Sequence, residues 1–156
     1  MGVFTSEVEY VTSISAANFF KAAVLNDSIV MPKALPKFVK SIEIISGDGG
    51  PGTIRKHNVA DGYSITEIVA IDKEKYEYKY IAREGRRIGE NLEKVYIEYK
   101  MIPREDGGCI IKKATKHYTK NNHTLDENYL KADDNLTISC MKLVDDFLLA
   151  HPEYYH

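Results

Sequence analysis

Apolar and polar residues alternate along most of this chain of 156 residues. The side chains of a strand point alternately to its two faces, so a period of two residues predicts β-strands. Turn-forming pairs such as Asp61-Gly62 and Asp106-Gly107 separate the alternating segments. The pattern predicts seven strands, over residues 3–11, 39–46, 53–59, 63–71, 75–83, 92–102 and 109–119.

The stretch between the first two strands departs from this alternation and predicts two short helices. In residues 13–25 apolar side chains recur at helical spacing, as Ile14, Ala17, Phe20 and Val24. Residues 26–28 supply capping side chains for a second helix, which must end before Pro36.

A third, much longer helix is predicted at the C-terminus. Thr124 and Glu127 have the spacing of a capping box, and Pro152 ends the segment. A helix of about 25 residues would be roughly 37 Å long. Its apolar stripe comprises Tyr129, Leu136, Cys140, Leu143 and Phe147, widened by Val144 and Leu148. A strongly bent antiparallel sheet is the natural cover for this stripe, which indicates an α+β fold.

A glycine-rich segment lies between the second and third predicted strands. It consists of Gly47, Asp48, Gly49, Gly50, Pro51 and Gly52. The glycine spacing matches a dinucleotide fingerprint, but that motif requires a helix to follow, and residues 53–59 predict a strand. Pro51 fixes a turn, and the Gly-Lys-Ser/Thr ending of a phosphate-binding loop is missing. We therefore expect a rigid turn between two strands.

Composition limits the partners of the protein. The length fits one domain over residues 1–156, and 44% hydrophobic with 28% charged residues is ordinary for a globular chain. A net charge of −2 offers no broad basic field, so we expect no nucleic acid as the main partner. No apolar run reaches the ~20 residues that span a bilayer, so we expect no membrane partner.

The N-terminus and the cysteines favour the cytoplasm. The first residues lack the basic region and apolar core of a signal peptide. Cys109 and Cys140 are the two cysteines, which is too few for a disulfide framework. We expect a cytoplasmic monomer.

Tyrosine is the residue that first points to a binding function. The chain has 11 tyrosines and no tryptophan, and on the strand around residues 76–81 Tyr76, Tyr78 and Tyr80 share one face. A buried hydroxyl without a partner costs about 1–3 kcal/mol, so a solid core would favour aliphatic side chains. Inward phenols therefore indicate an apolar but hydrated cavity, unless their tips reach the surface.

Several motifs, in order along the whole chain, resemble the plant pathogenesis-related class 10 family, which includes the major birch pollen allergen and cytokinin-binding nodulins. They are residues 2–5, 20–22, 32–34, 43–54, 92–94, 106–108 and 148–152. The glycine-rich segment and the Leu-Leu-Ala-His-Pro sequence of residues 148–152 are the most specific. The resemblance implies a helix-grip fold, in which seven antiparallel strands, two short helices and a long C-terminal helix enclose a hydrophobic cavity.

The resemblance also implies a function in binding small amphipathic ligands, such as cytokinins, flavonoids and related plant metabolites. No cofactor or metal follows from it, and His57, His117 and His123 lack metal-ligand spacing. The turn at Asp61-Gly62 is shorter than in the birch allergen, so Thr66 is an alternative to Tyr63 and Glu67 as an inward residue. The implied cavity positions are Met31, Val39, Arg55, His57, Val59, Tyr63, Thr66, Glu67, Tyr78, Tyr80, Val95, Tyr99, Tyr129, Leu136 and Cys140.

His57 has two interpretations. Its imidazole could hydrogen-bond a purine-like ligand, with Glu67 on the adjacent strand keeping it oriented and partly charged. Alternatively, a neighbouring group or water satisfies it.

Two enzymatic alternatives remain open. Ribonuclease activity is ascribed to the family through a strand glutamate and a Glu-x-Tyr pair on the last helix. Glu93 matches the first, but Asp145 and Phe147 stand at the other two positions, which weakens acid–base catalysis. Alkaloid-forming relatives condense metabolites with a lysine and carboxylates in the cavity, and here we expect no lysine on the inward faces.

Overall fold

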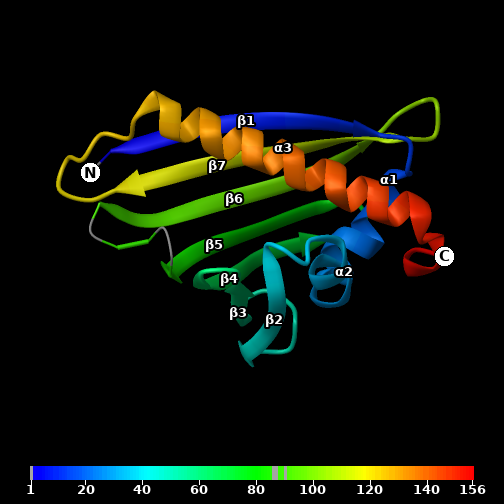
Figure 1. The fold of residues 1–156 in the computed structure, drawn as a ribbon, viewed down its shortest axis with the longest axis horizontal. Coiled ribbons are helices and arrows are strands. Elements are labelled where there is room, and N and C mark those ends of the chain that lie inside the picture. The colour runs from blue at the N-terminus through cyan, green and yellow to red at the C-terminus, as the bar shows by residue number, and fades with distance from the viewer. Residues whose placement is uncertain (1, 86–87, 90) are drawn as a thin grey trace.

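An antiparallel sheet of seven strands forms the centre of the computed structural model, which describes residues 2–85, 88–89 and 91–156 (Figure 1). The spatial order is β1-β7-β6-β5-β4-β3-β2, so β1 and β2 are the two edges. All seven predicted strands are present, as β1 Val3–Thr12, β2 Val39–Ser46, β3 Ile54–Val59, β4 Gly62–Asp72, β5 Glu77–Gly85, β6 Leu92–Pro103 and β7 Cys109–Thr119.

The glycine-rich segment is the turn between β2 and β3, as expected. Gly47 has a φ of 104°, a conformation that favours glycine, and a Cβ there would come within 2.7 Å of the backbone of Thr53. The Thr53 hydroxyl, fully buried, accepts a hydrogen bond from the Gly49 amide at 2.8 Å. The Gly52 amide donates to the Ile68 carbonyl at 2.8 Å, so the turn is also attached to β4.

The short helices cover one end of the sheet. They are α1 Ala16–Phe20, the π-helical turn η1 Lys21–Leu25, and α2 Asp27–Ala34. Their buried face comprises Ala16, Phe19, Phe20 and Ala23, whereas Ala17 is exposed. Ile14, Phe20 and Val24 of the predicted stripe are buried, so only the placement of Ala17 is wrong, because Ala16 and Phe19 face the core instead.

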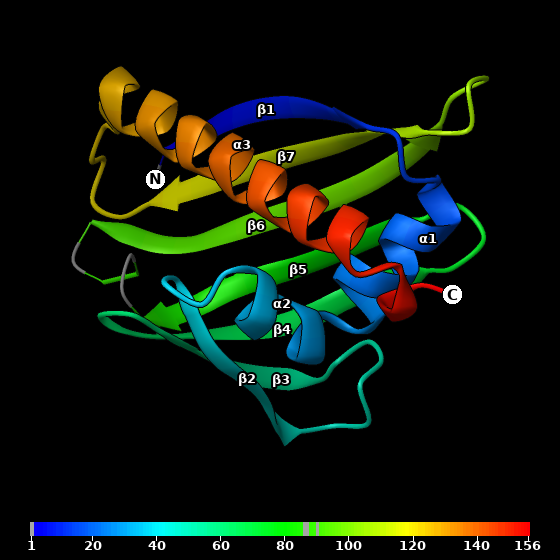
Figure 2. The ribbon, with the colours of Figure 1, turned by 45° about the vertical axis from the view of Figure 1, so that its right-hand side comes forward.

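The long helix α3 Glu127–Ala150 crosses the same face of the sheet, from the end where the N-terminus lies to the end covered by α1 and α2 (Figures 1 and 2). A 3₁₀ turn, η2 Pro152–Tyr154, follows it. The prediction that Thr124 caps α3 is wrong, because the Asp126 side chain accepts the Asn128 amide at 2.8 Å and is the N-cap. Within the described residues, no helix is long and apolar enough to cross a bilayer.

The inner face of α3 differs from the predicted stripe. Leu143 is 44% exposed, while the polar residues Asp133, Thr137 and Asp145 are buried. Met141, Val144 and Leu148 complete the inner face. The helix therefore presents several polar groups to the interior, which a face packed against a solid core would not do.

The apolar core is divided into two clusters. The larger joins α1, α2 and the C-terminal half of α3 to β-strand residues such as Ile68, Met101 and Ile111. The smaller is formed by Leu92, Val95 and Ile97 at the other end of the sheet. Tyr80 and Tyr99 pack against both clusters, and the space between them holds the cavity described below.

Asp145 attaches α3 to the edge strand β1. Its carboxylate accepts hydrogen bonds from the Tyr10 hydroxyl at 2.8 Å and from the Thr12 hydroxyl at 2.6 Å. Asp145 and Thr12 are both buried, so these hydrogen bonds are shielded from water. Burial, followed by the bond to Asp145, raises the pKa of Tyr10 to about 12, so this phenol stays protonated as a donor.

Replacing Asp145 by alanine should destabilise the fold by about 2–4 kcal/mol, because it leaves a buried hydroxyl without its acceptor. Urea unfolding measures the change. The matched control is Asp146→Ala, the next residue, which is exposed and pairs with Lys142 at 3.1 Å. That control should change the unfolding free energy by less than about 0.5 kcal/mol. Equal effects of the two substitutions would contradict the anchoring role.

Candidate functional site

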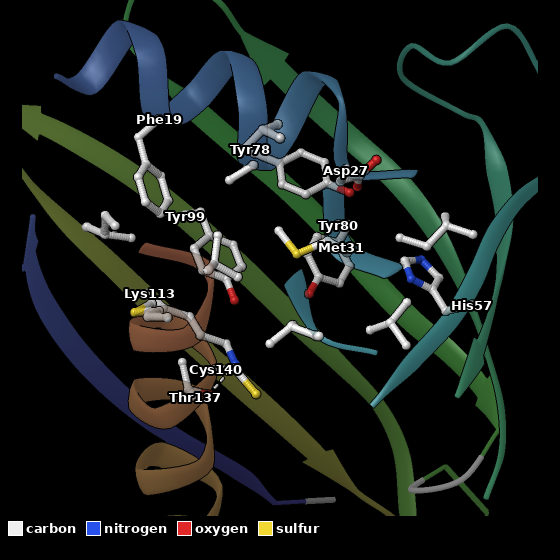
Figure 3. A pocket seen from close by; sticks show the side chains of 18 of the residues that line it. Phe19, Asp27, Met31, His57, Tyr78, Tyr80, Tyr99, Lys113, Thr137 and Cys140 are labelled. Atoms are coloured by element: carbon white, nitrogen blue, oxygen red, sulfur yellow. Dashed lines mark hydrogen bonds between the residues drawn. The ribbon is translucent and has the colours of Figure 1, made fainter. Parts of the chain in front are cut away.

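A cavity of about 400 Å³ lies between the sheet, α2 and α3 (Figure 3). This volume falls within the range of about 300–1,000 Å³ typical of small-molecule sites. Most of the lining is apolar, with polar groups at opposite ends. The lining comprises Phe19, Ala23, Val24, Asp27, Met31, Leu35, Val39, Ile42, Arg55, His57, Tyr78, Tyr80, Tyr99, Met101, Ile111, Lys113, Asp133, Leu136, Thr137, Cys140, Met141 and Val144.

A buried ion pair forms one polar end of the cavity. Arg55 on β3 binds both carboxylate oxygens of Asp27, at 2.8 and 2.9 Å, and donates to the Tyr78 hydroxyl at 2.6 Å. Arg55 is 7% exposed and Asp27 8% exposed. Burial lowers the pKa of Arg55, but the bond to Asp27 and the nearby charges outweigh it, so the pKa ends above its usual value. The guanidinium therefore remains charged.

His57 lies beside this pair, two residues along β3. Its Nε2 is 2.9 Å from the hydroxyl of Thr66. Burial, followed by the charge of Arg55, lowers the pKa of His57 to about 4. The imidazole is therefore neutral near pH 7 and acts as a hydrogen-bonding group. The expectation that Glu67 keeps it partly charged is wrong, because Glu67 faces outward and pairs with Arg83.

Lys113, Thr137 and Cys140 form the opposite end (Figure 3). The Lys113 ammonium donates to the Thr137 hydroxyl at 2.8 Å and lies 5.8 Å from the ring centroid of Tyr99. Burial raises the pKa of the Cys140 thiol, and Lys113 opposes this rise. The expectation that no lysine faces inward is thus wrong. The alternation of residues along β7 indicates the inward position of Lys113, because Lys113 lies two residues from the inward Ile111 and so shares its face.

Tyrosine hydroxyls point into the space between these two ends. The rings of Tyr78 and Tyr80 lie 5.0 Å apart, centroid to centroid. Within the described part of the chain, the hydroxyls of Tyr80 and Tyr99 form no hydrogen bond, and both residues line the cavity. Burial raises the pKa of each, so both remain neutral phenols that a ligand or water can bind.

Tyr76 does not belong to this row of phenols. It precedes β5 with a φ of 57°, so the prediction that it alternates with Tyr78 within the strand is wrong. Its ring packs on Phe20 at 5.8 Å between centroids.

Most of the predicted cavity residues do line the cavity: Met31, Val39, Arg55, His57, Tyr78, Tyr80, Tyr99, Leu136 and Cys140. The others lie outside this lining, and they are Val59, Tyr63, Thr66, Glu67, Val95 and Tyr129. None of residues 47–52, all of them described, contributes to the cavity either.

The displaced residues have identifiable roles. Tyr63 is 38% exposed and donates to Glu84 at 2.9 Å, so its inward placement is wrong. Thr66 is the inward residue of β4, reaching His57. Val95 belongs to the smaller core cluster, and the ring of Tyr129 meets His117 edge-on at 6.0 Å.

The residues implied for ribonuclease activity are far apart. Asp145 is bonded to Tyr10 and Thr12 near the end of β1. Glu93 lies at the start of β6, level with the Tyr118–Val3 pair at the other end of the sheet. Tyr10 lies seven positions along β1 from Val3, a distance of roughly 23 Å at ~3.3 Å per residue. These two carboxylates cannot act together on one phosphodiester.

Among the described residues, no group of three or more histidine, cysteine or acidic side chains is arranged to hold a metal ion. The polar groups of the cavity are distributed between its two ends, and each end combines one cation with hydroxyl groups. Such an arrangement suits hydrogen bonding to an organic molecule.

The low pKa of His57 predicts a loss of stability in mild acid. The unfolded chain takes up this proton below its ordinary pKa of 6.5 and the folded chain only below about 4, so lowering the pH through this window favours unfolding. The loss reaches at most about 3 kcal/mol. His57→Gln should reduce it in urea unfolding at pH 7 and 4.5. The exposed control His123→Gln should not, and an unchanged pH dependence in His57→Gln would refute the assignment.

Comparison with known proteins agrees with this architecture. The major allergen Pru av 1 of Prunus avium is 39% identical, with 100% of both chains covered. The solved structure of Ara h 8.0201 is 33% identical, with a TM-score of 0.84, and covers 96% of this chain and 100% of that chain. Norcoclaurine synthase from Thalictrum flavum, in complex with dopamine and hydroxybenzaldehyde, has a TM-score of 0.72 over 96% of this chain and 88% of that chain. At 21% identity, this last likeness concerns the fold alone.

The model of one protein family also matches nearly the whole sequence, over residues 1–151. Its fold, a curved antiparallel sheet with short helices and a long C-terminal helix, is the one described above. The expected resemblance to the pathogenesis-related class 10 proteins is confirmed, and the chain belongs to the Pathogenesis-related protein Bet v 1 family.

Proposed function

We propose that this protein binds a small amphipathic plant metabolite in the cavity between α2 and α3 and acts as its carrier or store. Cytokinins, flavonoids and related compounds are the candidate ligands. We further propose that it does so as a cytoplasmic monomer, in hormone storage or in defence and stress responses. Its two cysteines are free thiols, which suits a reducing compartment.

The observation that carries this proposal is a cavity of about 400 Å³ in which the hydroxyls of Tyr80 and Tyr99 have no hydrogen-bond partner within the described residues. A planar ligand can lie against the apolar side chains of Met31 and Leu136 while accepting from Tyr80 or Tyr99. The neutral His57 can donate to or accept from a ring nitrogen, because it does not require a charged partner. These groups match a flat heteroaromatic compound with polar atoms at both ends.

A second candidate function is condensation of an amine with an aldehyde, and Lys113 is the observation that favours it. Its ammonium lies inside the cavity beside Thr137 and Tyr99, and Asp133 also lines the cavity. These groups could transfer protons during condensation. A complex of norcoclaurine synthase, a structural neighbour, contains an amine and an aldehyde. Ribonuclease activity receives no such support, because Glu93 and Asp145 lie at opposite ends of the sheet.

Removing one hydroxyl tests the carrier proposal. Tyr80→Phe keeps the ring and should weaken ligand binding roughly fivefold to tenfold, the effect of about 1 kcal/mol for one hydrogen bond. Isothermal titration calorimetry with kinetin, indole and quercetin measures the affinities. Thermal unfolding of the free variant should be unchanged, since this hydroxyl has no partner in the described structure.

The control for this experiment is Tyr96→Phe. Tyr96 lies on the outer face of the same sheet, with the Lys116 ammonium 5.8 Å from its ring centroid. The Tyr96→Phe variant should therefore bind each ligand as tightly as the unaltered protein does. Saturable heat with none of the three probes, or equal affinities in both variants, would refute the proposed site.

The condensation candidate predicts a different result. Dopamine and hydroxybenzaldehyde incubated with the protein should yield a condensed product faster than in buffer, and Lys113→Met should abolish the excess rate while the fold is retained. Chromatography with mass detection measures the product. A rate no faster than in buffer, combined with saturable binding of kinetin or quercetin, would leave the carrier function and reject the enzyme.

A further inference from the structure

A second hollow of about 410 Å³ shares the Arg55–Asp27 pair with the cavity described above. We call it the loop chamber. Six residues line it without lining the main cavity, namely Leu25, Ser28, Ile44, Gly49, Ile68 and Ile71. It lies between the start of α2, the inner face of β2 and β4, and the glycine-rich turn.

A polar wall separates the two hollows. Five residues line both of them, the polar Asp27, Arg55 and Tyr78 together with the apolar Val24 and Ile42. Arg55 uses Nη1 and Nη2 to bind Asp27, and Nη2 also binds Tyr78. Its Nε is buried and has no hydrogen-bond partner within the described structure. That buried nitrogen is out of reach of a ligand, but the Tyr78 hydroxyl accepts from Arg55 and donates to no group within the described residues. An acceptor that reaches Tyr78 therefore gains a hydrogen bond that the protein does not provide.

The loop chamber opens to solvent at the edge of the sheet. Ile44 pairs in register with Arg55 and so lies on the inner face, yet it is 53% exposed. Leu25 on the facing turn is 40% exposed. Ile68 is buried below them. An apolar compound that enters here would cover side chains that the protein itself leaves in contact with water.

The floor of the loop chamber is rigid before any ligand enters. The Gly49 amide is bound to the buried Thr53 hydroxyl, and the Gly52 amide is bound to the carbonyl of Ile68. Such preorganisation reduces the ordering cost of binding. The wall restricts the charge of the ligand, because Arg55 and Asp27 neutralise each other and an ion of either sign would meet one like charge.

We propose that the loop chamber is a second small-molecule site, which takes a compact, neutral, apolar compound bearing one acceptor oxygen such as a ketone. The apolar body lies against Ile44, Ile68 and Ile71, and the oxygen is directed to the Tyr78 hydroxyl. This site is separate from the ligand site between α2 and α3 and does not depend on the function proposed for it.

The experiment titrates the protein with camphor, a compact neutral ketone, and follows the isoleucine methyl groups by nuclear magnetic resonance. Methyl shifts at Ile44, Ile68 and Ile71 should saturate. Ile44→Glu places a charge at the mouth of the chamber and should weaken camphor binding about tenfold or more. Ser28→Trp, at an exposed helix position that lines the chamber, should do the same by blocking it.

The matched control is Leu136→Glu. Leu136 is 39% exposed, lines the main cavity and does not line the loop chamber. This variant should lose affinity for kinetin or quercetin and keep its affinity for camphor, so failure at one site is distinguished from failure at the other. Camphene, a hydrocarbon of similar shape without oxygen, should bind several-fold more weakly than camphor.

Three results would overturn the proposal. The first is the absence of saturable shifts at the three chamber isoleucines. The second is camphor binding that Leu136→Glu abolishes and that neither Ile44→Glu nor Ser28→Trp changes. The third is equal affinity for camphor and camphene, which would remove the role assigned to the Tyr78 hydroxyl.

Discussion

The ion pair between Arg55 and Asp27 determines where the interior of this protein is filled and where it is hollow. It joins the first turn of α2 to the start of β3 through two side chains, and Tyr78 completes it from β5. Both partners are more than nine-tenths buried, so removing one would leave an uncompensated charge in the interior. The pair thus fixes α2 beside the sheet without closing the space on either side, and each hollow uses it as a wall.

The sequence predicted the order of elements well, because local signals specify them. Alternation marks the strands, and Asp-Gly, Gly-Gly and proline mark their ends. Errors occurred where two local signals compete. Thr124 has the spacing of a capping box, but Asp126 lies closer to the first turn and caps the Asn128 amide. Leu143 continues an apolar spacing on α3, yet the helix turns that position to solvent and buries Asp133, Thr137 and Asp145.

The site was predicted less completely, since a strand pattern specifies which residues share a face but not which face is inside. On β4 a displacement of one residue exchanges Thr66 for Glu67, and the register with β3 places Thr66 opposite Arg55. Asp27 could not be identified from sequence at all, because its role depends on Arg55, which is 28 residues away. Lys113 could have been found, since it alternates with Ile111 and Thr115 on β7.

The position of β1 has a consequence for the biosynthesis of the protein. The N-terminal strand pairs with β7, and the Gly2 amide bonds Thr119 across a separation of 117 residues. The hydrogen bonds of β1, the first strand of this chain to be synthesised, therefore cannot form until β7, the last strand, has been synthesised. Contacts so distant in sequence slow folding, and an unpaired edge is open to aggregation in the meantime. Glu7 and Glu9 on β1 carry charges that discourage pairing with other nascent chains. In the folded protein these charges are neutralised by Lys112 on β7.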